Sequence, residues 1–254
     1  MHRLARCASL AGIAISIGAC GDGDLAAPTI ISASPEANVT GASWVLLLED
    51  NFQRSLDPLK WSTATNIPQG RAKVFADGGH AVLVNRGHLT TVAQFRPKAL
   101  GGIRISGKWR FLGNGDDFLQ ILTRTNGFPG LSNPFGETAQ GIEFVAFGAG
   151  VFEDPNAMYI QGRGHAAGSV TDLLSRGSLV LTTGKTFRFE IVDDGQVMSF
   201  TLTDSEDPTR FRTVTARSPY VGESNHVTFH NREYCCLGDH RAILDDVRIE
   251  RSLH

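Results

Sequence analysis

Apolar and polar residues alternate along most of the chain beyond residue 43. The clearest case has two segments, residues 187–191 and 198–202, in which every second residue is apolar and those between are polar or charged. A period of two places the apolar side chains on one face of a β-strand. Because Asp193-Asp194-Gly195-Gln196 between the two segments has the composition of a tight turn, residues 186–203 are predicted to form a hairpin with one buried face.

Shorter segments of the same kind follow one another along the chain, separated by Gly, Asn and Asp. Helical periodicity is scarce, and only residues 170–175 are predicted as a short helical turn. Trp61 and Trp109 are assigned to the core. Many short strands joined by turns predict an all-β fold, either a β-sandwich or a barrel. The further predicted strands are residues 81–84, 88–92, 103–111, 118–124, 141–147, 157–163, 179–182, 212–216, 226–230 and 243–250.

Composition and charge agree with a folded domain. The 254 residues are 41% hydrophobic and 20% charged, which is ordinary for a globular protein. The formal net charge of -2 argues against a nucleic-acid partner, because nucleic-acid binders usually carry a dense basic surface.

The first twenty residues have the pattern of an export signal. Arg3 and Arg6 give a basic start, and residues 7–17 form an apolar run that is too short for a membrane-spanning helix. The following Ile17-Gly18-Ala19-Cys20 resembles a bacterial lipobox, in which the cysteine is lipidated and becomes the mature N-terminus. The alternative is a plain secretory signal with an incidental cysteine.

The lipoprotein interpretation divides the chain into a signal peptide at residues 1–19, a lipidated Cys20 with a flexible tether at residues 20–42, and one domain at residues 43–254. Cleavage removes two of the 24 basic residues and none of the 26 acidic ones, which leaves a net charge of -4. We therefore expect membrane attachment through acyl chains alone, in the cell envelope. The residue after Cys20 is Gly21, which resembles the sorting pattern of Gram-negative lipoproteins. If the source is Gram-negative, this residue favours the outer membrane.

Two of the four cysteines, Cys235 and Cys236, remain after Cys7 and Cys20 are assigned. In an oxidising compartment they can form a vicinal disulfide, pair with another molecule or stay as thiols. A bond between neighbours is strained, since a trans peptide holds their Cα atoms about 3.8 Å apart.

Three sets of residues give the chain a family resemblance. Glu49-Asp50-Asn51-Phe52 followed by Leu56-Asp57-Pro58-Leu59-Lys60-Trp61 resembles the opening strand and turn of the concanavalin A-like lectin and glucanase superfamily, and Leu244-Asp245-Asp246-Val247-Arg248-Ile249 resembles its closing strand. Gly141-Ile142-Glu143-Phe144 and Ala157-Met158-Tyr159-Ile160 are similar to the central strands of its keto-disaccharide hydrolase-like branch, with LamG-like domains as a related form. The resemblance implies a two-sheet antiparallel jelly-roll sandwich.

The resemblance also implies a structural calcium ion where the first and last strands meet. Calcium takes six to eight oxygen ligands, and the resemblance names Glu49 and Asp245 as candidates. Asp50 and Asp246 are weaker candidates, because alternation turns neighbouring side chains away. Solvated carboxylates at strand ends are the alternative.

The candidate binding residues lie on the central strands. Gln120 and Arg124 share one strand, Glu143 begins the next, and Tyr159, Gln161 and Arg163 alternate along a third. Planar amide, carboxylate and guanidinium groups suit sugar hydroxyls, and aromatic rings stack on sugar C–H faces. The alternative is the ordinary solvated face of a sheet. The loop at residues 125–141 is long enough to form the rim of a site or a surface excursion.

Catalysis is not the favoured interpretation. Glucanases of this superfamily carry several acids on one strand, because retaining cleavage needs two carboxylates about 5 to 5.5 Å apart. Here Val145 and Phe147 stand where partners of Glu143 would be. Asp116 or Asp117 on another strand is the alternative source of a second acid, although a turn beside Asn114-Gly115 is the favoured role of these two residues. The eight histidines do not cluster in the sequence, so each is interpreted as a surface or hydrogen-bonded residue.

Three functions follow from these patterns. The first is a surface-anchored lipoprotein that binds carbohydrate without catalysis. The second is a glycoside-acting hydrolase that uses Glu143. The third is an adhesion or structural module that presents its loops to a protein.

Overall fold

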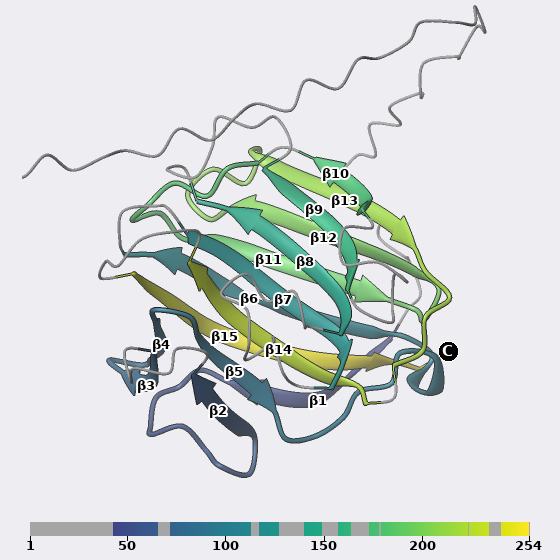
Figure 1. The fold of residues 1–254 in the computed structure, drawn as a ribbon, viewed down its shortest axis with the longest axis horizontal. Coiled ribbons are helices and arrows are strands. Elements are labelled where there is room, and N and C mark those ends of the chain that lie inside the picture. The colour runs from purple at the N-terminus through teal and green to yellow at the C-terminus, as the bar shows by residue number, and fades with distance from the viewer. Residues whose placement is uncertain are drawn as a thin grey trace, which may run out of the picture. The chain divides into compact units, whose positions relative to one another are not determined.

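The computed structural model describes residues 43–65, 72–112, 117–126, 140–148, 157–163, 173–177, 179–222, 224–233 and 240–253. These residues form fifteen β-strands and one short 3-10 helix at Lys98–Leu100. The strands make two antiparallel sheets that pack face to face (Figure 1), so the all-β jelly-roll prediction is confirmed. No helix in the described ranges is long and apolar enough to cross a membrane.

The first sheet, sheet A, has eight strands in the order β13-β12-β11-β6-β15-β4-β3, with β1 also paired to β15. The last strand, β15, pairs along its length with β6. On its other side, the first half of β15 pairs with β4 and the second half with β1. The strands of sheet A are β1 (Trp44–Asp50), β3 (Lys73–Asp77), β4 (His80–Val84), β6 (Ile103–Phe111), β11 (Phe187–Asp193), β12 (Val197–Asp204), β13 (Phe211–Arg217) and β15 (Arg241–Ser252).

The second sheet, sheet B, has seven strands in the order β10-β9-β8-β7-β14-β5-β2. Strands β9, β8 and β7 follow one another in the sequence, whereas β14, which lies beside β7, comes from a distant part of it (Figure 1). The strands of sheet B are β2 (Trp61–Thr65), β5 (Gly87–Thr91), β7 (Asp117–Thr125), β8 (Gly141–Phe147), β9 (Met158–Arg163), β10 (Leu173–Gly177) and β14 (His226–Glu233).

The core is an apolar layer shared by the inner faces of both sheets. The β11–β12 hairpin forms as predicted, with Phe189, Ile191 and Phe200 almost fully buried while the residues between them face outward. Its turn is held by Asp194, whose Oδ1 accepts hydrogen bonds from the backbone N–H groups of Gln196 at 2.7 Å and Val197 at 2.6 Å. Local alternation therefore sets which side chains enter the core.

The first and last strands lie beside one another, as the resemblance implies. Trp61 is 3% exposed and donates its indole N–H to Asp50 Oδ2 at 2.8 Å, while Asp57 accepts the backbone N–H groups that close the preceding turn. Trp109 is 1% exposed. Both tryptophans therefore belong to the core, as predicted.

Three local predictions are corrected. Residues 173–175, predicted as part of a helical turn, belong to strand β10, which pairs with β9 and gains its hydrogen bonds from that neighbour. Residues 179–182, predicted as a strand, form only one isolated bridge at Leu181. Strands β2 and β3 were not predicted, and β3 has no fully buried residue, so its alternation between core and solvent is weak.

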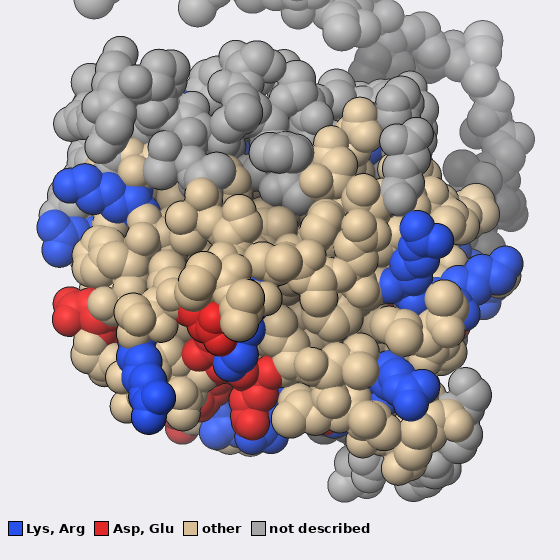
Figure 2. All heavy atoms as spheres, turned by 90° about the horizontal axis from the view of Figure 1, so that it is seen from below, with Lys and Arg blue, Asp and Glu red and all other residues tan. Residues whose placement is uncertain are grey.

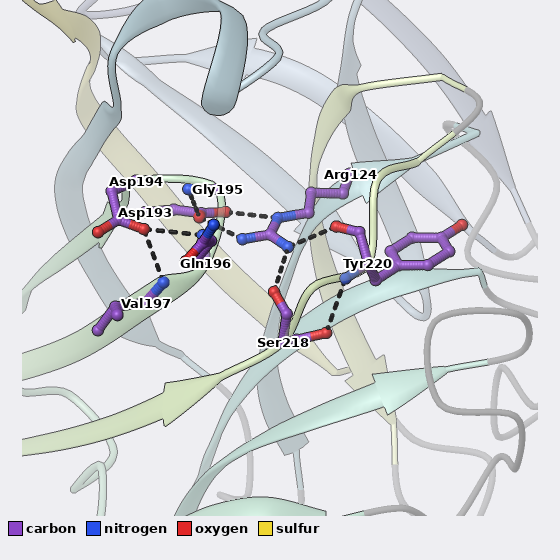
Figure 3. A network of polar contacts seen from close by, with 8 residues as sticks. All are labelled: Arg124, Asp193, Asp194, Gly195, Gln196, Val197, Ser218 and Tyr220. Atoms are coloured by element: carbon purple, nitrogen blue, oxygen red, sulfur yellow. Dashed lines mark hydrogen bonds and ion pairs between the residues drawn. The ribbon is translucent and has the colours of Figure 1, made fainter.

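An ion pair joins the two sheets near one end of the sandwich (Figure 3). Arg124 of sheet B and Asp193 of sheet A are 1% and 0% exposed, and the guanidinium donates to both carboxylate oxygens, at 3.0 Å from Nε and 2.5 Å from Nη2. The remaining Nη1 donates to the carbonyl oxygens of Ser218 at 3.1 Å and Tyr220 at 2.6 Å. Each buried charge is thereby compensated.

The surface mixes charges of both signs. Figure 2 shows acidic and basic side chains next to one another over part of the face in view, with Lys and Arg side chains also spread along its margins. Several of the described basic residues pair with carboxylates, among them Arg248 with Glu49 at 2.6 Å and Arg104 with Glu250 at 2.6 Å. These contacts balance charge locally across neighbouring strands.

We expect Asp193→Asn to destabilise the protein by about 3–5 kcal/mol, because it leaves the Arg124 guanidinium buried without a counter-charge. Urea denaturation followed by fluorescence measures the change. Glu206→Gln is the matched control, since Glu206 pairs with Lys185 at 3.2 Å in an exposed position, and we expect it to change stability by less than about 1 kcal/mol. Equal effects of the two substitutions would contradict a special role for the buried pair.

Candidate functional site

The candidate site is the outer face of sheet B, the side turned away from sheet A. On β7, β8 and β9 the residues Leu119, Ile142 and Ile160 enter the core, so their neighbours Gln120, Glu143 and Gln161 project from the opposite face. Strand register then places the polar residues of different strands in rows across the sheet.

One row crosses five strands. Val145 of β8 lies between Tyr159 of β9 and Gln120 of β7, and Gln120 lies opposite His230 of β14, which in turn lies opposite His88 of β5. A parallel row contains Glu143, directly opposite Gln161. The structure therefore brings together five of the six predicted binding residues: Gln120, Glu143, Tyr159, Gln161 and Arg163.

Glu143 is the centre of this arrangement. Its carboxylate is fully buried, and it accepts a hydrogen bond from Arg163 Nε at 2.7 Å and another from the side-chain amide of Gln120. Because the Gln120 NH₂ group faces this carboxylate, its carbonyl oxygen faces His230 Nδ1 at 2.7 Å. The imidazole must then carry its proton on Nδ1, so a single chain of hydrogen bonds runs from Arg163 to His230.

Two histidines form the far end of the row. The rings of His88 and His230 lie perpendicular to one another with centroids 5.9 Å apart, and both residues are 1% exposed. Burial lowers the pKa of His88 to about 4. Burial, followed by the charges of His88 and Arg232, lowers the pKa of His230 well below its ordinary value. Both imidazoles are therefore neutral at neutral pH.

Aromatic rings form the other end of the face. Phe147 stacks at a tilt on Phe118, with centroids 4.6 Å apart, and meets Tyr159 edge-on at 5.8 Å. Phe147 and Tyr159 are half-buried, whereas Glu143 has no exposed surface. Burial, with the charge of Glu143 as the next contribution, raises the pKa of the Tyr159 phenol, so it keeps its proton and can donate a hydrogen bond.

The structure corrects the predicted placement of Arg124. It was predicted to share the face of Gln120, but the pairing of β7 with β14 shifts register between His226 and Thr228, and Arg124 has a positive φ of 52°. Such a bulge breaks the alternation, so the side chain turns toward Asp193 instead (Figure 3). Arg124 therefore joins the two sheets and lies apart from the candidate site.

The residues named for calcium do not assemble a site. Glu49 pairs with Arg248 at 2.6 Å, and Asp245 lies 3.5 Å from His80. The neighbouring Asp246 pairs with Lys108 at 2.5 Å. No group of three metal-ligating side chains occurs within the described ranges. These carboxylates have nitrogen partners in place of the several oxygen ligands that calcium needs, so the expectation is not supported.

Several predictions fall outside the described residues. They are the signal peptide, Cys20 and the tether, the cysteines Cys235 and Cys236, Asp116, and most of the loop at residues 125–141. His88 and His230 were missed because they lie far apart in sequence. Alternation with the buried Leu89 and Phe229 would have put both imidazoles on the outer face, but only strand order makes them neighbours.

Several solved structures have a fold similar to that of this chain. Peanut lectin bound to a 9-mer peptide matches with a TM-score of 0.57 at 12% identity, over 84% of this chain and 100% of the lectin. A Bacillus subtilis protein of unknown function with a galectin-like fold matches with a TM-score of 0.56 at 11% identity, over 83% of this chain and 98% of its own. The exoplasmic/lumenal domain of VIP36, solved with Ca²⁺ and Man3GlcNAc, gives 0.57 at 10%, over 78% and 88%. The chain matches no protein-family model and no curated protein.

These likenesses identify the class of fold. At 10–12% identity they show that the chain is a jelly-roll β-sandwich of the kind found in legume lectins and galectin-like proteins. The shared fold does not by itself transfer a ligand, because one fold carries many functions.

We expect the stability of the protein to fall on acidification because of His88. Below about pH 6.5 the unfolded chain protonates this imidazole, whereas the folded state does not until about pH 4. The unfolded state then binds more protons, so unfolding becomes easier as the pH falls, by about 2 kcal/mol between pH 7 and pH 4.5.

Denaturant titrations at these two pH values test this expectation. The His88→Gln variant cannot take up the proton, so its stability loss over the same interval should be smaller than that of the wild type by about 2 kcal/mol. His230 contributes in the same direction in both proteins. An unchanged pH dependence in His88→Gln would show that His88 is not buried as a neutral group.

Proposed function

We propose that this protein is an exported, lipid-anchored carbohydrate-binding protein that holds its ligand at the outer face of sheet B. The observation that carries the proposal is that three different polar groups share one face of strand β9. A phenol, an amide and a guanidinium, from Tyr159, Gln161 and Arg163, project from one face of this strand. Together they offer the donors, acceptors and aromatic surface that sugars use.

The residues of the face divide into two roles. Glu143 and Gln120 are fully buried and bond to neighbouring side chains, so they act as positioning residues. Tyr159 is half-buried, whereas Gln161 and Arg163 are buried at 8% and 6% exposure, so Tyr159 is the group of the three that is most accessible to a ligand. The buried pair of Glu143 with Arg163 fixes the guanidinium before the ligand arrives, which lowers the entropic cost of binding.

Binding is favoured over glycoside cleavage by the environment of Glu143. Among the described side chains of this face it is the only carboxylate, and both of its oxygens accept hydrogen bonds from other residues. Val145 and Phe147, which follow on the same face of β8, are apolar. Glycoside cleavage by a pair of carboxylates would need a second acid beside Glu143, and none occurs among the side chains that the structure describes on this face.

The structural neighbours give independent support. The VIP36 domain was solved with Man3GlcNAc, and peanut lectin shares the same sandwich. Tyr159 and Phe147 add a half-buried aromatic surface of the type on which sugar rings stack.

A glycan array probed with the mature domain tests the proposal. We expect binding to a subset of glycans, and we expect Tyr159→Ala to weaken it about tenfold or more, because the stacking surface is lost. Phe75→Ala is the matched control, since Phe75 is a 40% exposed aromatic residue on β3 of sheet A, and it should leave binding unchanged.

Other outcomes assign another function. Release of reducing ends that disappears in Glu143→Gln would contradict a non-catalytic role and favour the hydrolase. An absence of both glycan binding and product release would favour a module that binds protein.

The lipid anchor is supported by the lipobox-like residues before Cys20 and by the tether that follows it. In a bacterial host we expect labelled palmitate to be incorporated into the wild type and lost in Cys20→Ser. Cys7→Ser is the matched control, because Cys7 lies in the segment that cleavage removes, and it should still be labelled. A wild-type protein recovered unlabelled in the soluble periplasm would contradict the anchor.

A further inference from the structure

A cavity lies on the outer face of sheet A, on the opposite side of the sandwich from the candidate site. It has a volume of about 390 Å³ and is built over strands β11, β6 and β15, which lie side by side in the sheet (Figure 1). Its size falls in the range of small-molecule sites. Its lining includes three basic side chains, which are Lys108, Arg110 and Arg188.

Strand register forces these positive charges together. Arg188 of β11 lies directly opposite Lys108 of β6, and Arg110 is two residues further along the same face of β6. Like charges directly opposite on neighbouring strands destabilise a sheet. The arrangement therefore has an electrostatic cost, which the pairing of Lys108 with Asp246 offsets only in part.

Only one of these three charges is neutralised within the described part of the chain. Lys108 pairs with Asp246 at 2.5 Å. Arg110 and Arg188 make no ion pair with any described carboxylate. The guanidinium groups of Arg110 and Arg188 therefore line one cavity without a described counter-charge. A guanidinium binds planar or tetrahedral oxyanions through two parallel hydrogen bonds.

The rest of the lining suits hydroxyl groups. Asp245 of β15 lies opposite Lys108 and 3.5 Å from His80, and all three residues line the cavity. Ser205 also lines the cavity.

We propose that this cavity binds an acidic saccharide, with a carboxylate or sulfate group on Arg110 and Arg188 and sugar hydroxyls toward Asp245 and Ser205. The shared chemistry is an oxyanion carried on a hydroxylated ring. The site lies on a different sheet from Tyr159 and Glu143, so it does not rest on the function proposed above.

The test is a calorimetric titration of the mature protein with trigalacturonate, with its neutral methyl ester and with sodium sulfate. We expect the acid to bind about tenfold or more tightly than the methyl ester, because the ester keeps the hydroxyls and removes the charge. We expect sulfate to compete, but more weakly than the saccharide. Raising the salt concentration should weaken binding of the acid.

The variants identify the site. Arg110→Gln combined with Arg188→Gln should weaken trigalacturonate binding about tenfold or more. Arg217→Gln, an exposed arginine on β13 outside the cavity, removes one charge in the same way and should leave binding within about twofold. Tyr159→Ala should also leave it unchanged, which separates this site from the one on sheet B.

Thermal unfolding checks that the variants fold. Arg188→Gln should melt no lower than the wild type, because it removes a like-charge contact, and trigalacturonate should raise the melting temperature of the wild type but not of the double variant. Equal binding of the acid and its methyl ester, or an equal loss in Arg217→Gln, would overturn the proposal. Sulfate binding as tight as that of trigalacturonate would overturn its saccharide part and leave a site for free oxyanions.

Discussion

The packing of two sheets on one shared apolar layer is the constraint on which the rest of this structure depends. The central strands contribute alternate residues to that layer, as Phe144, Ile191 and Phe229 do from three different strands. A residue beside a core position must then face outward, because successive side chains on a strand point to opposite faces. The outer face of each sheet is therefore where polar groups from distant segments meet.

Buried carboxylates in this sandwich are tolerated because arginines lie against them. Glu143 and Asp193 have no exposed surface, and each accepts hydrogen bonds from an arginine, Arg163 and Arg124 respectively. An unpaired charge in either place would cost several kcal/mol. The two pairs differ in consequence, since Arg124 with Asp193 connects the sheets, whereas Arg163 with Glu143 orders one outer face.

The two outer faces differ in how far their polar groups are satisfied. On sheet B, a hydrogen-bonded chain runs from Arg163 through Glu143 and Gln120 to His230, and half-buried aromatic rings border it. On sheet A, Arg110 and Arg188 remain without a carboxylate partner among the described residues. The polar groups of the first face are therefore fixed by their neighbours, whereas two guanidinium groups of the second are left without a described counter-charge.

The sequence by itself determined the class of fold, the β11–β12 hairpin and the outward placement of Gln120, Glu143, Tyr159 and Gln161, because each follows from a local period of two. Tertiary structure decided what alternation cannot encode. A register shift turned Arg124 toward Asp193, pairing with β9 made a strand of residues 173–177, and sheet order joined His88 to His230. The physical reason is that strand register and neighbours are set by contacts between segments far apart in the chain, which no local pattern contains.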